Sequence, residues 1–514
     1  ALSALVVAEC SQPLALGGIK ANIGHAEAAA GLVGLLNAYM VLQRAVVPPN
    51  AQLQTLNPHV HRALAQTKIG LSTQLVMSQP KKRAAGSASS FGYNGTIAHC
   101  IMGHSGGLHA PHIECPDESS VQYRRQRFTW RSHKCRAFGP GTRPIVRNGL
   151  RKRNAVMGLK AVLNMVNRNV ESHVDADTPL LDSRLDSLGA VELRNQLQQS
   201  VGRSLPSTLV FEYPTARQLA SHLQRGAPSF VPASMVALQP YGRFAPSVHG
   251  LSVMLPGGAA SLEAAWCVSA SGADMISEVP MKRWVLLALQ EPLSSRMRHG
   301  GFVVGVELFD AAAFGISSAE AAAMDPQQRL LLEHGWAALH EAGLTRSALA
   351  GSLTGVFVAI SANDYGQLTV ASTEAATSVY AATGSSHSIA AGRLSFVLGL
   401  HGPCVAYDTA CSSGLVATHT ALSTLQRGDC ARALVGAVNL MLAPAVGISF
   451  AVAGMTSLLG HSHSFDARAD GYARAEACAF ALLTDESEAF DAQVRPMLSG
   501  GCIRQDGRSA SLTA

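Results

Sequence analysis

The stretch that decides the fold is Asp408-Thr409-Ala410-Cys411-Ser412-Ser413-Gly414. The residues that follow, 413–426, have the apolar periodicity of a helix, so Cys411 is expected at a helix N-terminus. The positive end of the helix dipole and the unpaired N–H groups of the first turn both favour a thiolate there. Such a thiolate can take an acyl group from a thioester. The competing interpretation is that Cys411 is a small apolar side chain of the core, which is the commoner role of a lone buried cysteine.

Further motifs flank this stretch on both sides. They are Leu255-Pro256-Gly257-Gly258, Met324-Asp325-Pro326-Gln327-Gln328-Arg329, Phe465-Asp466 and Asp470-Gly471-Tyr472-Ala473-Arg474. Together with residues 408–414 they resemble the β-ketoacyl synthases (ketosynthases) of modular polyketide synthases. The resemblance covers most of residues 251–514 and implies that Cys411 is the nucleophile that carries the acyl chain.

The N-terminal block resembles a different portion of the same family. Its motif is Lys20-Ala21-Asn22-Ile23-Gly24-His25-Ala26-Glu27-Ala28-Ala29-Ala30-Gly31. A lone histidine before an apolar helix is usually a satisfied core residue, but the resemblance implies that His25 is catalytic. Its implied role is to stabilise charge on a thioester carbonyl while malonyl loses carbon dioxide. Lys20 corresponds to the lysine of the same motif.

Two shorter stretches of the same block extend the resemblance. Residues 89–96 resemble the glycine-rich loop that closes a ketosynthase beside its nucleophile. Residues 123–128 resemble the strip that follows a ketosynthase in these enzymes. The second resemblance implies that this strip packs on the ketosynthase and is more than a linker.

The middle of the chain carries Leu185-Asp186-Ser187-Leu188-Gly189-Ala190-Val191-Glu192-Leu193-Arg194. Apolar stripes on either side predict short helices, and Thr215 is a suitable N-cap for the last one. A serine at a helix start is normally only a cap, but this motif resembles the attachment site of acyl carrier proteins. The resemblance implies that a phosphopantetheinyl transferase attaches 4'-phosphopantetheine from coenzyme A to Ser187. The thiol of that arm would hold the growing acyl chain.

The last block alternates apolar strand candidates with helix candidates, which is typical of α/β proteins with buried strands. The strand candidates are Gly355–Ile360 and Ala433–Leu440, and the helix candidates are Gln327–Ala342 and Ser413–Gln426. With the resemblance, the expected fold class is α/β, with thiolase-like layered ketosynthase portions flanking a small all-α four-helix acyl carrier domain. The expected domains are residues 1–103 (C-terminal part of a ketosynthase), 104–154 (basic linker), 155–226 (carrier domain), 227–246 (linker) and 247–514 (N-terminal part of a second ketosynthase).

Composition limits the remaining possibilities. The chain has 514 residues and a formal charge of +6, but residues 122–153 alone hold eleven Lys and Arg and no acid, so the rest is net negative. This distribution favours a basic linker, or a docking strip for an acidic partner, over a nucleic-acid-binding protein. None of the ten cysteines forms a C-x-x-C pair, so no metal site is expected. Residues 433–460 lack charge, but their glycines and proline favour a buried strand plus loop over a membrane span.

The resemblance also implies partners. Acyl and malonyl thioesters on carrier domains would be the substrates. No acyltransferase lies between the ketosynthase and the carrier, so one elsewhere in the protein or acting in trans would load the extender units. A ketosynthase homodimer in the full protein and a cytoplasmic location are also expected.

Each ketosynthase portion is expected to be incomplete. The chain contains no His-Gly-Thr-Gly-Thr motif, which holds the first catalytic histidine of the family. The second portion then has Cys411 without a catalytic histidine, and the first has His25 without a nucleophile. Two functions therefore compete: decarboxylative condensation of thioesters, and a carrier or scaffold that presents a tethered acyl chain without condensing it. A structural hypothesis is that the two portions pack together as a circular permutant, which would place Cys411 and His25 in one pocket.

Overall fold

The structure is a computed structural model. It describes residues 2–7, 14–65, 67–77, 84–104, 121–129, 159–167, 175–178, 180, 193–194, 196–198, 200, 209, 213, 215–224, 245–284, 290–372, 378–484 and 495–507. The chain divides into two compact units. The sheet unit contains Ala1–Gly92, Thr96–Ser132 and Pro240–Gln505. The helical unit contains Tyr93–Gly95, His133–Gln239 and Asp506–Ala514.

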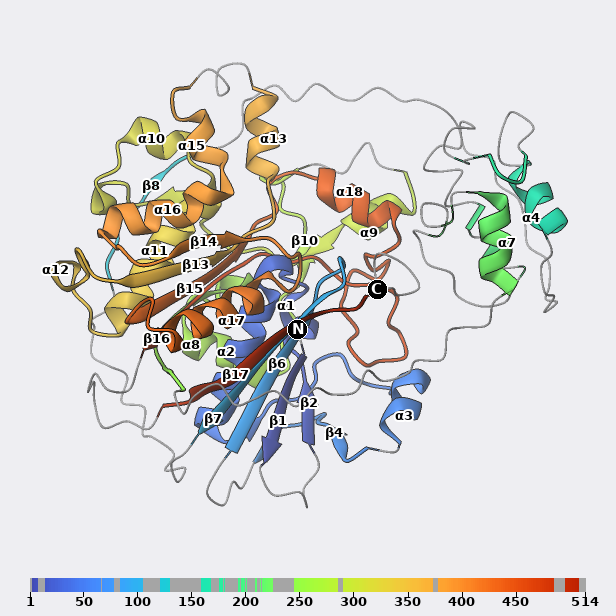
Figure 1. The fold of residues 1–514 in the computed structure, drawn as a ribbon, viewed down its shortest axis with the longest axis horizontal. Coiled ribbons are helices and arrows are strands. Elements are labelled where there is room, and N and C mark those ends of the chain that lie inside the picture. Colours follow the sequence, from blue (N-terminus) through green and yellow to red (C-terminus); the bar gives the residue numbers. More distant parts are fainter. Residues whose placement is uncertain are drawn as a thin grey trace. The chain divides into compact units, whose positions relative to one another are not determined.

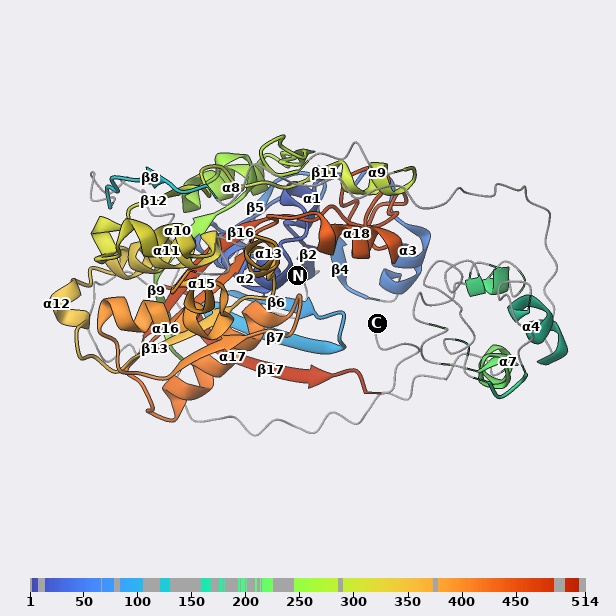
Figure 2. The same ribbon diagram turned by 90° about the horizontal axis from the view of Figure 1, so that it is seen from above.

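The sheet unit is built on one sheet of eleven strands, in the order β14-β13-β15-β16-β9-β17-β7-β6-β1-β2-β4. The N-terminal end of the chain supplies β1 (Leu2–Val7), β2 (Leu14–Gly17), β4 (Ile69–Leu71), β6 (Ala84–Phe91) and β7 (Thr96–His104). The C-terminal end supplies β9 (Ser247–Met254), β13 (Thr354–Ala359), β14 (Cys404–Tyr407), β15 (Arg432–Asn439), β16 (Ala477–Thr484) and β17 (Met497–Gln505). Figures 1 and 2 show the blue and red strands side by side in this sheet.

We call residues 1–132 the leading segment and residues 240–505 the trailing segment. They join where β7 pairs antiparallel with β17, from Gly103 opposite Met497 to Thr96 opposite Gln505. The hypothesis that the two ketosynthase portions pack together therefore agrees with the structure. The described residues of the two portions form one compact unit, and they follow each other along the chain in the expected order.

Helices pack against the strands of this sheet. Those of the sheet unit are α1 (Lys20–Ile23), η1 (Glu27–Ala29), α2 (Ala30–Arg44), α3 (Pro58–Leu64), η2 (Pro256–Gly258), α8 (Leu262–Ala270), α9 (Leu293–Met297), η3 (Ala312–Phe314), α10 (Ser318–Ala323), α11 (Pro326–Glu341), α12 (Arg346–Leu349), α13 (Asp364–Val370), α15 (Ala381–Ser385), α16 (His387–Leu398), α17 (Ser413–Gln426) and α18 (Ala445–Val452). Three pairs of short strands complete it: β3 (Val46–Val47) with β5 (Val76–Met77), β8 (Gln126–Arg127) with β12 (Leu308–Phe309), and β10 (Ser277–Glu278) with β11 (His299–Gly300).

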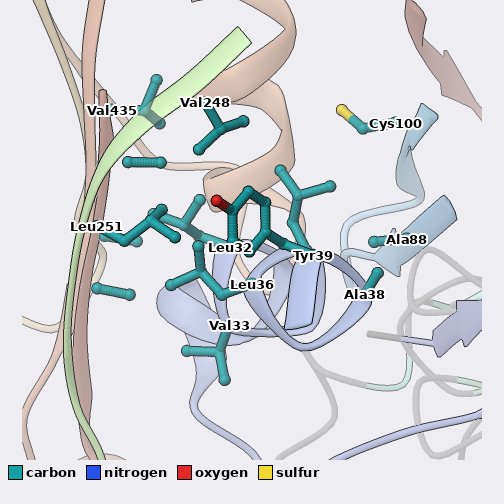
Figure 3. Packing of buried hydrophobic residues seen from close by; sticks show 14 of the residues in the cluster. Leu32, Val33, Leu36, Ala38, Tyr39, Ala88, Cys100, Val248, Leu251 and Val435 are labelled. Carbon is teal, nitrogen blue, oxygen red and sulfur yellow. The ribbon is translucent and has the colours of Figure 1, made fainter. Parts of the chain in front are cut away.

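The helices α2 and α17 form the innermost layer. The helix α2 packs against β1 and β6 on one side and against β16 and α17 on the other, while α17 reaches β13, β15, β7 and β17. Figure 3 shows side chains of α2, such as Leu36 and Tyr39, between Ala88 on one side and Leu251 on the other. A helix that is apolar all round needs such enclosure.

The elements expected in the last block are present. The strands β13, β15 and β16 are buried along almost their whole length because the sheet is covered on both faces. The helix α11 begins after Asp325, whose side chain accepts a hydrogen bond from Gln327 N, with Pro326 in the first turn. The uncharged stretch 433–460 forms β15, a loop and α18. Within the described ranges, no helix has the length and apolarity that crossing a membrane requires.

The helical unit holds a small apolar core of its own. Its described helices include α4 (Leu159–Val166) and α7 (Ala216–Gln224). The core side chains include Val162, Val166, Leu193, Leu197 and Leu219. The spacing of Leu193 and Leu197, four residues apart, is that of one helix face. Ser187 lies outside the described residues.

Candidate active site

Cys411 stands on a tight turn between β14 and α17. The preceding residue, Ala410, has a left-handed backbone (φ 54°), which costs a residue with a side chain about 1–2 kcal/mol. Hydroxyl groups of the next turn hold this geometry: Thr409 N donates to Ser413 Oγ at 2.8 Å, and Ser413 Oγ donates to Ala410 O at 2.6 Å. Cys411 itself is half-buried, so its sulfur stays accessible at the start of the helix.

His25 reaches the same place from the leading segment. Its Nε2 lies 3.0 Å from Cys411 Sγ, although the two residues are 386 positions apart in the chain. The backbone of His25 is fixed on both sides, because His25 N donates to Ala473 O at 2.7 Å and Ala475 N donates to His25 O at 2.8 Å. The ring of Tyr472 stands edge-on to the imidazole, with 5.0 Å between ring centroids.

The surroundings keep His25 neutral. Burial lowers its pKa well below the usual value, and the positive charges of Lys20 and Arg474 lower it further. The other ring nitrogen, Nδ1, is buried and has no hydrogen-bond partner among the described residues. An unpaired lone pair is tolerated better than an unpaired buried N–H, so we assign the proton to Nε2. His25 then presents an N–H donor to whatever lies at Cys411.

Lys20 belongs to the same neighbourhood. It begins α1, one turn before His25. Burial lowers the pKa of its ammonium, and the charge of Cys411 acts in the opposite direction. The structure thus brings together three of the four residues singled out in the sequence: Cys411, His25 and Lys20. The fourth, Ser187, falls outside the part of the chain that the structure describes.

Two contacts of the site were not expected from the sequence. Ser90 is fully buried and its Oγ donates to Cys411 O at 2.5 Å. Arg474, whose positive charge acts on His25, pairs with Glu27, with its Nε 2.5 Å from Oε1. Both pairs join the leading segment to the trailing segment. The motifs that hold these residues are visible in the sequence, but nothing in them indicates which residues touch.

Small residues line the site. Ala475 and Ala477 are both buried without a positive φ, so neither alanine is strained there. Gly414 lies against the backbone of α2, where a Cβ would be 2.8 Å from Leu32 N. The glycine therefore permits a closer approach of two helices.

Comparison with family models covers both units. The model "Beta-ketoacyl synthase, N-terminal domain" matches residues 247–489, and "Beta-ketoacyl synthase, C-terminal domain" matches residues 1–54. The model "Phosphopantetheine attachment site" matches residues 159–223. A match to the C-terminal domain of a synthase therefore precedes a match to an N-terminal domain in this chain.

The curated relatives are much longer than this chain. A polyketide synthase of Streptomyces halstedii is 42% identical over 340 residues, which is 64% of this chain and 9% of that protein. The chain belongs to the modular polyketide synthases. The mycoketide-CoA synthase of Mycobacterium tuberculosis is 38% identical over 66% of this chain and 8% of its own length, and an erythronolide synthase of Saccharopolyspora erythraea is 38% identical over 67% and 11%. This polyketide synthase chain spans about a tenth of the length of these relatives.

Solved structures of ketosynthases are also similar. The ketosynthase from module 6 of the bacillaene synthase of Bacillus subtilis 168 is 32% identical, with a TM-score of 0.43 over 47% of this chain and 40% of that one. The oxazolomycin ketosynthase domain from Streptomyces albus JA3453 is 32% identical, with a TM-score of 0.45 over 48% and 43%.

The family matches and the mixed sheet confirm the expected fold class, which is a thiolase-like layered α/β ketosynthase and an all-α carrier domain. The carrier domain is of the kind that holds covalent 4'-phosphopantetheine.

Proposed function

We propose that this polyketide synthase chain condenses acyl and malonyl thioesters, with loss of carbon dioxide, during polyketide chain assembly. The observation that carries the proposal is the 3.0 Å contact between Cys411 Sγ and His25 Nε2 inside one folded unit. A nucleophile and a hydrogen-bond donor at this distance fit both halves of such a reaction.

In the first half-reaction, the Cys411 thiolate attacks the carbonyl carbon of an acyl thioester. A new C–S bond forms, the bond to the carrier sulfur breaks, and the departing thiolate takes up a proton. The N–H of His25 donates to the carbonyl oxygen while negative charge develops on it. The nearby ammonium of Lys20 makes the same pocket more favourable for negative charge.

In the second half-reaction, a malonyl thioester occupies the pocket. Its carboxylate leaves as carbon dioxide, and the electrons of that C–C bond form an enolate whose oxygen accepts the His25 hydrogen bond. The enolate carbon then attacks the acyl group on Cys411, and the cysteine thiolate departs. Because burial and nearby cations hold His25 neutral, it acts as a donor throughout.

We propose that the carrier domain, residues 155–226, uses Ser187 as its attachment residue. The described part of the domain fits this use, because Leu193 and Leu197 bury one face of a helix that follows the serine. The bound phosphopantetheine supplies a thiol that holds acyl groups as thioesters. A phosphopantetheinyl transferase attaches the arm, and an acyltransferase elsewhere in the protein or in trans loads the extender unit, in the cytoplasm.

We also propose that the sheet unit forms a homodimer through β14. This strand ends the sheet and pairs only with β13 among the described strands. Its residues Cys404 and Val405 are exposed, and beside it Phe396 of α16 is 86% exposed. An open apolar edge strand invites pairing with another strand, and the β14 of a second copy satisfies both sides equally.

The alternative function, a carrier or scaffold without condensing activity, rests on the incompleteness of each ketosynthase portion. The assembly of Cys411, His25 and Lys20 in one unit weighs against it. The two functions differ in a single observable, which is acylation of Cys411.

Intact mass spectrometry tests the proposal in two stages. The chain is first incubated with coenzyme A and a phosphopantetheinyl transferase, with Ser187→Ala as control. It should gain one phosphopantetheine, and the variant should gain none. The chain is then given a soluble acyl thioester, and one acyl group should appear that is lost in Cys411→Ala. A folded chain that gains the arm but no acyl group at Cys411 would leave only the carrier function.

A further inference from the structure

We infer that Ser361 and Asp364 are positioning residues for acyl transfer to Cys411. Both belong to the loop that follows β13, residues 360–364, which we call the β13 loop. Ser361 holds the turn that carries Cys411, and Asp364 holds the loop that follows β15, residues 440–443, which we call the β15 loop. The inference rests on the proposed function and deepens it, because it assigns a role at the same site to residues that take no part in the chemistry.

The three strands that lead to these loops are neighbours in the sheet. The strand β13 lies between β14 and β15 and runs parallel to both, with Ala359 opposite Tyr407 of β14 and Ala437 of β15. Parallel neighbours in this register end at the same edge of a sheet, where α/β proteins bind their ligands. Cys411 follows β14, so an acyl group on its sulfur lies at this edge. The β13 loop leaves the sheet between the other two loops.

Ser361 supports the turn in front of the nucleophile through Asp408. The Ser361 hydroxyl donates to Asp408 Oδ1, and Ala410 N donates to the same oxygen at 3.1 Å. Ala410 is the residue with the left-handed backbone that directly precedes Cys411. The Asp408 side chain is exposed, so water competes for its carboxylate, and the bond from Ser361 keeps the carboxylate over Ala410 N. Without that bond the strained turn can relax, which moves the sulfur.

Asp364 supports the β15 loop from a buried position. Its Oδ2 accepts hydrogen bonds from Leu442 N and Ala443 N, both at 2.9 Å, and the residue is 1% exposed. These N–H groups lie between the end of β15 and the start of α18, so no strand or helix supplies an acceptor for them. A carboxylate is costly to bury unless it is hydrogen-bonded. The two bonds offset that cost and fix the loop in place.

Two further buried side chains belong to the same network. Gln327 of α11 donates from Nε2 to Ala362 O of the β13 loop at 2.9 Å and accepts from Leu440 N of the β15 loop at 3.2 Å. Glu476 Oε1 accepts from Met441 N at 2.9 Å. All four N–H groups of the β15 loop therefore bond to side chains of other elements. A satisfied buried network is rigid, and this one joins the β13 and β15 loops into one support.

The experiment measures the reactivity of Cys411 in the full chain and in Ser361→Ala. Alkylation by iodoacetamide is followed by peptide mapping and mass spectrometry, with the exposed Cys267 as the reference in the same digest. The ratio of the Cys411 rate to the Cys267 rate should fall about three- to fivefold in the variant, because one hydrogen bond is lost. Acylation by a saturating soluble thioester should slow by the same factor. The half-saturating concentration should not change, because Ser361 does not touch the acyl donor. A native ratio in Ser361→Ala would overturn the proposal.

Two further variants separate positioning from a general effect on the strand. Ser361→Thr keeps the hydroxyl and should restore both rates to within about twofold of native. Ser352→Ala is the matched control, because Ser352 Oγ is hydrogen-bonded to Thr354 Oγ1 at 2.9 Å at the other end of β13. It should leave both rates unchanged. Equal losses in Ser352→Ala and Ser361→Ala would assign the effect to the whole strand and contradict the role of Ser361.

The role of Asp364 is tested by two substitutions at one position. Asp364→Asn keeps an oxygen that can accept from Leu442 N and Ala443 N, so acylation should stay within about threefold of native. Asp364→Ala leaves both N–H groups buried without an acceptor, and acylation should fall about tenfold or more. Equal rates in the two variants would mean that these hydrogen bonds do not position the loop. Ser361 is only half-buried, so its variants decide the inference even where Asp364→Ala does not fold.

The outcome is separable from that of the condensation test, because alkylation needs no thioester. A native chain that takes no acyl group, while Ser361→Ala still slows the alkylation of Cys411, would contradict the proposed function alone. A native chain that is acylated, and a Ser361→Ala variant that is alkylated and acylated at the same rates, would contradict the present inference alone.

Discussion

Ser90 takes no part in the proposed reaction, but it contacts the nucleophile directly. It lies on the leading segment, yet its hydroxyl holds the carbonyl oxygen of Cys411. The residue before the nucleophile, Ala410, has a left-handed backbone that stores strain. Ser90 therefore acts as a positioning residue that keeps the strained turn, and with it the sulfur, in place.

The substitution Ser90→Ala should lower the rate of acyl transfer to Cys411 about 5- to 10-fold, from the loss of about 1 kcal/mol of hydrogen bonding. The KM for the acyl thioester should not change, because Ser90 does not touch the acyl donor in this scheme. Steady-state kinetics with a soluble thioester measures both quantities. Ser89→Ala is the control, because Ser89 Oγ bonds to His99 Nδ1 and not to the nucleophile. A rise in KM with unchanged turnover would assign Ser90 to substrate binding instead.

For single residues, the sequence predicts which side chains belong to the site better than it predicts which of them are in contact. Cys411, His25 and Lys20 are recognisable from their motifs, and the structure gathers them. The bond from Ser90 to Cys411 is not predictable, because serine is a common residue in loops and a hydrogen bond depends on separations of a few tenths of an ångström. The neutral state of His25 also depends on surroundings that no local pattern shows.

Among the secondary-structure elements, α17 has the strictest packing. Its second residue, Gly414, touches the backbone of α2, so no side chain fits without a shift of one helix. Gly392 of α16 differs, because a Cβ there would meet nothing within 4 Å. Packing therefore requires glycine at position 414 but not at position 392.

Alanine at these two positions should have opposite effects on stability. Gly414→Ala should lower the free energy of unfolding by about 1–3 kcal/mol through overpacking. Gly392→Ala should raise it by about 0.5–1 kcal/mol, since alanine restricts the unfolded chain and favours the helix. Urea denaturation followed by circular dichroism measures both. An equal rise in the free energy of unfolding for both variants would mean that α2 and α17 can move apart to accommodate a methyl group at no cost.

The elements of the last block were predictable because their apolar runs are long and their caps are standard. The expected strand Gly355–Ile360 is β13, and the expected helix Ser413–Gln426 is α17. The pairing of β7 with β17 was not predictable in detail. A strand's sequence indicates that it is buried, whereas its neighbour and register follow from the assembled sheet.

For the whole molecule, the carboxylate of Asp466 makes the joining of the two segments sensitive to acid. Hydrogen bonds from Arg468, and further ones from Thr55 and Gln54, hold its pKa well below the usual value of 3.8. Above about pH 5 the group is ionised in both the folded and the unfolded chain, and its stabilising effect is fully present. As the pH falls further, the unfolded chain takes up the proton first, so this stabilisation is lost toward the folded-state pKa.

Urea midpoints measured from pH 6 down to pH 3 should show this dependence. The difference in stability between the native chain and Asp466→Asn should be constant above about pH 5 and should shrink as the pH falls toward 3. A difference that does not change over this range would mean that the Asp466 contacts owe nothing to its charge.

The separation along the chain between the residues of the site also affects how the fold forms. His25 and Cys411 touch although they are 386 positions apart. A contact between residues so far apart can form only after a long loop has closed, and folds that depend on such contacts fold slowly. The apolar surface of α2 therefore stays exposed until late in folding, so newly made chains should depend on chaperones that shield hydrophobic surface.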